Sequence, residues 1–210
     1  MPSLRPAGVV GVILAGGRSL RMGGGDKALV TVAGASLLAR TLAALRPQVG
    51  PLVLNSASAA VRRAAPELPA VADALPGFAG PLAGILAALD WTRVHAPDCR
   101  WLVSVPVDAP LFPADLVARL AAAVAAGEGD LACAASGGRH HPVFGLWPLA
   151  LTEELRRAVV VEGVSKIDAW TGRYRLAEVE WPDRPLDPFL NINTPEDLEN
   201  LRVRLTAPAV

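Results

Sequence analysis

The sequence predicts an α/β fold of the Rossmann-like type, in which a mostly parallel sheet lies between two layers of helices. Short apolar runs of strand length alternate along the chain with longer segments whose apolar residues recur at helical spacing. The chain has 210 residues, of which 52% are hydrophobic and 19% are charged, and this composition suits one ordered domain with a sizeable core. Repeated strand–helix–strand units of this kind build a three-layer α/β/α structure.

The first half of the chain contains four of the expected strands. Each is a short apolar run that ends in a polar or glycine-rich segment or leads directly to one. Between them, leucine, isoleucine and valine recur on one helical face. Pro47 ends the first of these helices, and Gly80-Pro81 and Pro113 open the next two. The expected strands cover residues 9–14, 52–55, 70–73 and 101–105.

The second half is expected to complete the sheet. A turn over residues 137–142 is predicted to join a strand over 131–135 to a strand over 143–146, and a further strand over 176–181 is placed at the edge. Two helices are expected over 151–160 and 165–170. The last helix is predicted to begin at Thr194-Pro195, because threonine caps a helix and the acids that follow suit its first turn.

A glycine-rich segment, residues 14–27, includes the end of the first expected strand. Five glycines between positions 16 and 25 let the backbone turn sharply, and successive N–H groups in such a turn form an anion-binding concavity. Arg18, Arg21 and Lys27 add positive charge, so the loop is expected to bind a polyphosphate. It is not a Walker loop, since Ala28 follows the lysine, and it lacks the dinucleotide fingerprint G-x-G-x-x-G. A solvated surface loop is the alternative.

Polar residues follow several expected strands at the edge of the sheet where parallel strands end. Ligands of open α/β sheets bind beyond that edge. Asn55 and Asp73 end the second and third strands, and Asp108 lies three residues past the fourth. An aspartate in this place is a normal ligand for Mg²⁺, which takes one or two protein carboxylates together with phosphate and water. The alternatives are a turn-forming aspartate before Pro110 and ordinary strand-end caps at Asn55 and Asp73.

Residues 14–27, with Ala15-Gly16-Gly17 near their start, resemble the signature of the nucleotidyltransferases that make molybdenum cofactor dinucleotides, and the second glycine favours the GTP-dependent members. Residues 80–84, 105–110, 141–142 and 191–195 are similar to further segments of that family. The resemblance implies one nucleotidyltransferase-type domain over residues 1–210, with a nucleotide half over roughly 8–110 and an acceptor half over roughly 111–205. It also implies an enzyme that transfers GMP from GTP to the terminal phosphate of molybdenum-molybdopterin and releases pyrophosphate. A cytoplasmic location is expected from the residues themselves, because the apolar run over residues 9–15 is too short to span a bilayer and the charged glycine-rich loop follows it directly.

The resemblance implies a role for each matching residue. Asp108 would hold Mg²⁺, while Lys27 and Arg21 would neutralise the triphosphate, and these three are the expected catalytic residues. Asn55 and Asp73 would select the nucleotide, with the choice between base and ribose left open. The residues implied for GTP binding are Leu14, Ala15, Gly16, Gly17, Lys27, Asn55, Asp73 and Asp108, and those implied for the pterin substrate are His141, Asn191 and Asn193. His140 and His141 are not expected to share a metal ion, because adjacent residues of an extended chain point to opposite faces.

Charge and cysteine content bear on the remaining partners. The 20 Lys and Arg residues are balanced by 20 Asp and Glu residues, so neither nucleic acid nor a membrane surface is expected as a partner. Cys99 and Cys133 form no C-x-x-C pair and are expected to be reduced thiols. The resemblance allows transient contacts with other proteins of molybdenum cofactor synthesis or with acceptor proteins. Three alternatives stay open: a CTP-dependent pterin cytidylyltransferase, a sugar-phosphate nucleotidyltransferase, and a non-catalytic protein that binds nucleotide or pterin.

Overall fold

The computed structural model describes residues 8–16, 18–19, 25–73 and 80–206. Within these residues the strands are β1 (Val9–Leu14), β2 (Arg18–Ser19), β3 (Gly25–Asp26), β4 (Thr31–Val32), β5 (Ala35–Ser36), β6 (Leu52–Asn55), β7 (Ala70–Val71), β8 (Trp101–Pro106), β9 (Leu131–Ser136), β10 (Arg139–Pro148) and β11 (Leu176–Trp181). Its α-helices are α1 (Leu37–Leu45), α2 (Ala59–Ala64), α3 (Pro81–His95), α4 (Leu116–Ala125), α5 (Thr152–Val160), α6 (Ile167–Thr171) and α7 (Pro195–Thr206). Short 3₁₀ turns are η1 (Lys27–Leu29), η2 (Arg46–Gln48) and η3 (Leu149–Leu151).

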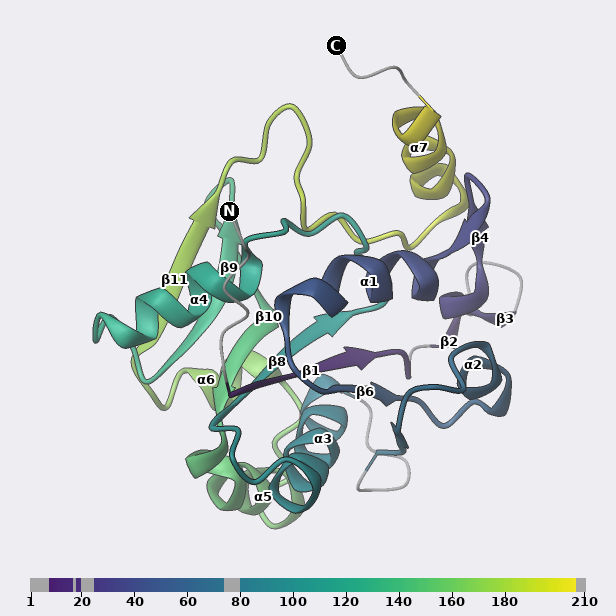
Figure 1. Cartoon of the computed structure of the whole chain (residues 1–210). Coiled ribbons are helices and arrows are strands. Elements are labelled where there is room, and N and C mark those ends of the chain that lie inside the picture. The colour runs from purple at the N-terminus through teal and green to yellow at the C-terminus, as the bar shows by residue number, and fades with distance from the viewer. Residues whose placement is uncertain (1–7, 17, 20–24, 74–79, 207–210) are drawn as a thin grey trace.

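Seven strands form one sheet in the order β11-β9-β10-β8-β1-β6-β7. β10 runs antiparallel to both of its neighbours, whereas every other adjacent pair of strands in this sheet is parallel. Helices α1 and α4 lie on one face of the sheet, and α3 and α5 lie on the other (Figure 1). The mostly parallel, three-layer α/β/α fold expected from the sequence is therefore confirmed.

The interior strand β1 contributes to both faces of the sheet. Its side chains alternate, so that Val9 and Ile13 pack with α1 and α4 while Val10 and Val12 pack with α3. All four are essentially inaccessible to solvent. A strand buried on both sides is a continuous apolar run rather than an alternating one, which is why this stretch of the sequence clearly predicts a buried strand.

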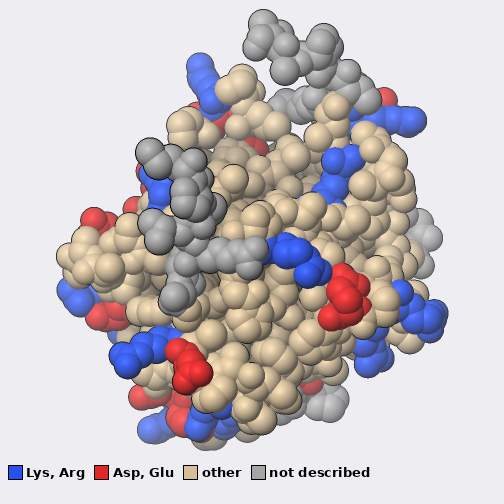
Figure 2. Space-filling model, in the orientation of Figure 1, with Lys and Arg blue, Asp and Glu red and all other residues tan. Residues whose placement is uncertain are grey.

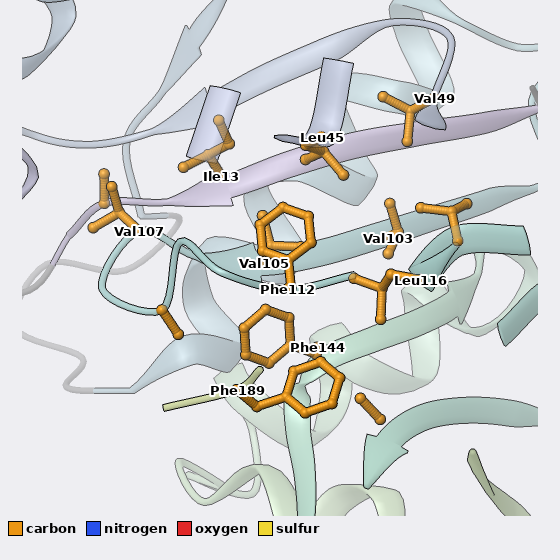
Figure 3. Close-up of a cluster of buried hydrophobic side chains, with 14 of the residues drawn as sticks. Ile13, Leu45, Val49, Val103, Val105, Val107, Phe112, Leu116, Phe144 and Phe189 are labelled. Carbon is orange, nitrogen blue, oxygen red and sulfur yellow. The ribbon is translucent and has the colours of Figure 1, made fainter. Parts of the chain in front are cut away.

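Three phenylalanines join the last loop to the core on the α1 and α4 face (Figure 3). The ring centroid of Phe144 on β10 lies 5.7 Å from that of Phe112 and 4.9 Å from that of Phe189. Phe189 comes from the segment between β11 and α7, far along the chain from Phe112. Tilted and edge-on ring pairs at these distances are favourable beyond the area they bury, so the cluster ties this late segment to the sheet.

Side-chain caps fix the starts of several helices. The Ala39 N–H donates to Ser36 Oγ (3.1 Å) at the start of α1. At α7 the Asp197 N–H donates to Thr194 Oγ1 (3.1 Å), and the Asp197 carboxylate accepts in return from the Thr194 N–H (2.8 Å). This reciprocal arrangement satisfies two backbone donors that the helix itself leaves without partners. The predicted start of the last helix is confirmed.

Several expected boundaries are corrected. The strand expected over 70–73 has only the two residues of β7. Helix α4 begins at Leu116 and not at Pro113, whose carbonyl accepts the Leu116 N–H (3.2 Å) in a preceding turn. The turn expected over 137–142 consists of Gly137 and Gly138, whose φ values of +54° and +75° suit a tight hairpin. β10 therefore begins earlier than expected, at Arg139, and its pairing with β9 shifts register between His141 and Gly145.

Helix α2 and the small strands β2 to β5 were not anticipated from the sequence. Each is shorter than seven residues. Over so few residues, hydrophobic periodicity gives no usable signal. The start of α2 does carry a recognisable mark, since Ser58 Oγ accepts the Val61 N–H (3.3 Å).

On the face shown in Figure 2, positive and negative side chains are interspersed over the surface, in keeping with the balanced composition. Among the described residues, none of the helices is both long enough and apolar enough to cross a membrane. Cys99 is partly exposed and Cys133 is buried, and both are free thiols.

The two thiols are expected to differ sharply in reactivity. Burial, with help from the Glu178 and Asp168 carboxylates, raises the pKa of the Cys133 thiol to about 12, so almost none of it is thiolate at pH 8. Titration with Ellman's reagent should therefore detect at most one reactive thiol in the folded protein, Cys99, and two after unfolding in guanidinium. Rapid reaction of both thiols in the native protein would contradict the buried position of Cys133.

Candidate functional site

A cavity of about 630 Å³ opens at the edge of the sheet where β1, β6 and β8 end. Its lining comes from both halves of the chain, namely from the ends of these strands, from the start of α3 and from β10. The lining residues are Leu14, Gly16, Lys27, Asn55, Asp73, Gly80, Pro81, Pro106, Val107, Asp108, Arg139, His140, His141, Pro142, Val143, Phe144 and Asn191. Most of the sequence-predicted site residues that the structure describes are thus brought together.

Lys27 is at the centre of the polar contacts in this cavity. Its Nζ donates to Oδ2 of Asp108 (2.8 Å) and to Oδ1 of Asn193 (2.6 Å). Only 9% of Lys27 is exposed to solvent, so its charge is held where water screens it little. An ammonium has three N–H donors, and these two acceptors use two of them. One donor remains for a ligand.

Asp108 is held by backbone contacts on both sides. The neighbouring Val107 N–H donates to the Leu14 carbonyl (3.1 Å), which continues the pairing of β8 with β1. The Asp108 carbonyl accepts the Ile192 N–H (2.7 Å), which fastens the segment before α7 to the end of β8. Ile192 is buried, whereas Asn191 and Asn193 on either side of it are exposed. Asn193 contacts Lys27, and Asn191 lies in the cavity wall.

Asn55 and Asp73 form a second polar contact at the sheet edge. The Asn55 amide group donates from Nδ2 to Asp73 Oδ1 (3.0 Å) and to the Val71 carbonyl (3.4 Å). Asn55 is 3% exposed, whereas Asp73 is exposed to the cavity. The amide is therefore committed to holding the carboxylate, and Asp73 is the member of the pair that can meet a ligand.

Gly84 of α3 makes room for the Asn55 side chain. A Cβ at position 84 would lie 2.4 Å from Asn55 Oδ1 and 2.8 Å from its Cγ. The N-terminus of the same 15-residue helix, Gly80-Pro81, lies in the cavity wall. Because the first N–H groups of a helix have no partners within it, this end of α3 favours a negatively charged ligand.

The glycine-rich loop is described only in part. Gly16 is exposed and lines the cavity, while Ala15 is buried and its N–H donates to the Asn55 carbonyl (2.9 Å). That N–H therefore belongs to the sheet. Gly17 and Arg21 lie outside the described residues.

His141 and His140 point in different directions from adjacent positions on β10. The His141 ring contacts Ser136 through Nε2 (2.8 Å), and its centroid lies 5.0 Å from that of Phe189. Burial lowers the pKa of His141 below its usual value. His140 instead lies 3.8 Å from an Asp168 oxygen and 3.7 Å from a Glu178 oxygen. Within the described part of the chain, no three His, Cys, Asp or Glu side chains are grouped as a metal site.

Asp108 fits a divalent cation of the kind that keeps most of its water. A quarter of its side chain is exposed, and it reaches the cavity with one oxygen engaged by Lys27. Mg²⁺ takes one or two protein carboxylates and completes its shell with water and phosphate oxygens. A single carboxylate beside a space large enough for a nucleotide triphosphate suits that mode of binding.

Sequence reasoning missed three groups in this region. Arg139 lines the cavity at the start of β10, and Ser136 and Asp187 contact each other behind His141 (2.9 Å between Oγ and Oδ1). Arg139 could have been found from its place beside the His-Pro pair. Ser136 and Asp187 are 51 positions apart, and no spacing rule relates them.

Comparison with known proteins gives a consistent result. The MobA-like NTP transferase domain matches residues 11–177. A molybdenum cofactor guanylyltransferase from Bradyrhizobium sp. (strain ORS 278) is 53% identical over 198 residues, which cover 94% of this chain and 93% of that protein. The resemblance noted in the sequence is confirmed.

Two solved structures are similar in fold. Molybdopterin-guanine dinucleotide biosynthesis protein A from Archaeoglobus fulgidus superposes with a TM-score of 0.73 at 23% identity, covering 94% of this chain and 98% of that one. A manganese complex of a protein from Mycobacterium tuberculosis H37Rv has a TM-score of 0.66 at 21% identity, covering 93% and 98%. At these identities the likeness concerns the fold, which is of the nucleotidyltransferase type.

Replacing Gly84 by alanine tests the contact between α3 and Asn55. Alanine normally stabilises a helix interior by about 1 kcal/mol relative to glycine. Here the added Cβ would collide with Asn55, and we expect the free energy of unfolding in urea to fall by about 1–3 kcal/mol instead. Combining Gly84→Ala with Asn55→Ala removes the obstructing atoms, so the double variant should lose less than the sum of the single losses. Strict additivity would contradict the contact.

Proposed function

This chain belongs to the MobA-like NTP transferase family, and we propose that it transfers GMP from GTP to the terminal phosphate of molybdenum-molybdopterin. The products are the guanine dinucleotide cofactor and pyrophosphate. The observation that carries this proposal is the contact of Lys27 with both Asp108 and Asn193, which joins a cation, a carboxylate and the segment before α7 at one cavity. The 53% identity to a molybdenum cofactor guanylyltransferase over nearly the whole chain supports the choice of reaction.

We place the triphosphate against Gly16 and Lys27. Gly16 has no side chain to obstruct a phosphate, and the remaining N–H donor of the Lys27 ammonium is free to reach a phosphate oxygen. The N-terminal end of α3 adds favourable potential on the same side of the cavity. Arg21 and the backbone of Gly17 belong to the same proposal on the strength of the family resemblance.

Asp73 is the proposed reader of the base. A carboxylate can accept hydrogen bonds from both the N1–H and the exocyclic amine of guanine, and cytosine offers no matching pair of donors. Asn55 holds this carboxylate in place from a buried position (3.0 Å), so it acts on the base through Asp73. Asp73 is thus proposed to contact the base and Asn55 to hold Asp73, whereas the sequence alone does not distinguish the roles of these two residues.

Asp108 is the proposed ligand for Mg²⁺. A divalent cation at this carboxylate would neutralise charge on the phosphates and so favour attack by another anion. A structural neighbour of this chain was solved as a manganese complex, which agrees with divalent metal chemistry on this fold. Before nucleotide binds, Lys27 is paired with the same carboxylate (2.8 Å), and binding of a triphosphate gives the ammonium a second anionic partner.

The transfer itself requires no covalent intermediate with the protein. An oxygen of the acceptor phosphate forms the new bond to the α-phosphorus of GTP, and the bond from that phosphorus to the bridging oxygen breaks, so that pyrophosphate leaves with its electron pair. A phosphate monoester is largely ionised at neutral pH and needs no general base. The protein contributes by aligning two anions and compensating their charge, which is the main source of rate in phosphoryl-type transfers. His141, Asn191 and Asn193 are the proposed contacts of the acceptor.

Nucleotide preference tests the proposed reaction. With purified protein, Mg²⁺ and molybdopterin, pyrophosphate release should be at least about tenfold faster with GTP than with CTP or ATP, because one lost hydrogen bond to a charged group costs about 1.5–3 kcal/mol. Asp73→Ala should bring the GTP rate down towards the CTP rate and leave the CTP rate nearly unchanged. A faster rate with CTP would identify a cytidylyltransferase. Binding of GTP without release from any nucleotide would identify a non-catalytic protein.

Metal binding separates the roles of Asp108 and Lys27. Using Mn²⁺ as an electron paramagnetic resonance probe, Asp108→Asn should abolish binding and lower turnover by about two or more orders of magnitude. Lys27→Met should strengthen Mn²⁺ binding without nucleotide, by about tenfold (~1.4 kcal/mol), because no ammonium then competes for Oδ2. The same variant should bind GTP more weakly. Near-normal turnover of Asp108→Asn would remove this carboxylate from the mechanism.

A further inference from the structure

Asp187, Ser136 and His141 form a hydrogen-bonded series at the acceptor side of the cavity, which we name the orienting triad. Ser136 Oγ donates to Asp187 Oδ1 (2.9 Å) and lies 2.8 Å from His141 Nε2. Ser136 is 2% exposed, so both contacts are shielded from water. His141 borders the cavity and the other two residues lie behind it.

Strand geometry places the serine and the histidine on the same face of the sheet. His141 on β10 is opposite Ala134 on β9, and Ser136 is two residues further along β9. Because side chains of a strand alternate, Ala134 and Ser136 point the same way. The two partners of this diagonal pair therefore meet, while His140 is directed elsewhere, towards Asp168 and Glu178.

The direction of the hydrogen bonds follows from the supply of protons. A serine hydroxyl has one proton, and an ionised carboxylate only accepts, so the Ser136 proton points at Asp187. Ser136 Oγ must then accept from His141, which puts the ring proton on Nε2. The hydrogen-bond network thus assigns the tautomer, and Nδ1 becomes the acceptor nitrogen of the ring.

One short segment supplies both the carboxylate and a second constraint on the ring. The Phe189 N–H donates to Asp187 Oδ1 (2.9 Å), the same oxygen that accepts from Ser136. The Phe189 ring packs on His141 (centroids 5.0 Å apart) and is itself fixed against Phe144 in the core (Figure 3). The imidazole is therefore held at one edge by a hydrogen bond and on one side by a buried aromatic ring.

We propose that Ser136 and Asp187 are positioning residues that fix the His141 ring with its proton at Nε2, so that Nδ1 accepts a hydrogen bond from an N–H group of the pterin. A neutral ring with a lone pair at Nδ1 attracts a donor and repels a phosphate oxygen. This assigns His141 to the heterocycle of the acceptor and leaves its phosphate to the cations of the cavity. The contact with the pterin rests on the proposed function, whereas the tautomer does not.

The charged groups around His141 are compatible with a neutral ring. Burial has the largest effect on its pKa and lowers it; Asp187 and Glu180 act in the opposite direction, and Arg139 and His140 lower the pKa further. The serine hydroxyl also separates the imidazole from the carboxylate, so the ring gains a fixed orientation without a direct ion pair. A histidine bonded directly to aspartate would be drawn towards the charged form.

The tautomer can be measured directly by ¹⁵N NMR of the imidazole on the full chain, with His141→Gln used to assign its signals. At pH 7.5 the free wild-type protein should have a protonated Nε2 and an unprotonated Nδ1. Ser136→Ala should give a mixture of the two neutral tautomers, and Ser136→Thr, which keeps the hydroxyl, should retain the wild-type pattern. A charged ring or a proton on Nδ1 in the wild-type protein would overturn the proposal.

Steady-state kinetics test the consequence for the acceptor. Ser136→Ala should raise the KM for molybdopterin by about tenfold, the value of one hydrogen bond, while the KM for GTP and kcat change by less than about twofold. Ser136→Thr should behave like the wild type. Equal losses for GTP and acceptor would indicate a general structural defect and overturn the positioning role. A wild-type protein with the expected tautomer but no pyrophosphate release would contradict the proposed function and still support the orientation of His141.

Discussion

The ion pair between Lys27 and Asp108 is the contact on which the rest of the site depends. It joins the 3₁₀ turn after the glycine-rich loop to the end of β8, and through Asn193 it reaches the segment before α7, 166 positions away in the sequence. Burying two charges costs hydration free energy. The attraction between the charges offsets this cost only when the geometry is good and further hydrogen bonds are made. Asn193 supplies one of these, and the cavity leaves room for the ammonium to bind a triphosphate as well.

The sheet makes this contact possible by setting its register. β1 lies between β6 and β8, and the pairing of Leu14 with Asn55 on one side and with Pro106 on the other brings the three strand ends to the same level. Strand β10 runs antiparallel to β8 and pairs with it from Gly145 onwards. The first part of β10, Arg139 to Phe144, lines the cavity beside these strand ends. The residues proposed to face the nucleotide and those proposed to face the acceptor therefore line one cavity.

Much of this arrangement could be predicted from the sequence because it follows from periodicity. The long apolar strands, the helices that pack on them and the polar residues after the strand ends were identified, and Asn191 and Asn193 alternate with buried Ile192 as their spacing requires. Contacts that depend on three-dimensional fit could not be predicted. Gly84 matters because of Asn55, and Ser136 matters because of Asp187 and His141, yet no local pattern marks these partners. The start of β10 at Arg139 was not predicted, because Pro142 and the register shift between His141 and Gly145 interrupt the regular strand pattern.

A crystal structure with GTP and Mg²⁺, determined without the acceptor, tests most directly whether Lys27 and Asp108 bind the nucleotide and the metal. The triphosphate should lie against Gly16 with Lys27 in contact with a phosphate oxygen, the metal should be bound to Asp108, and guanine should lie beside Asp73. A nucleotide bound elsewhere, with Lys27 and Asp108 still paired only with each other and with Asn193, would show that this cavity is not where the nucleotide reacts.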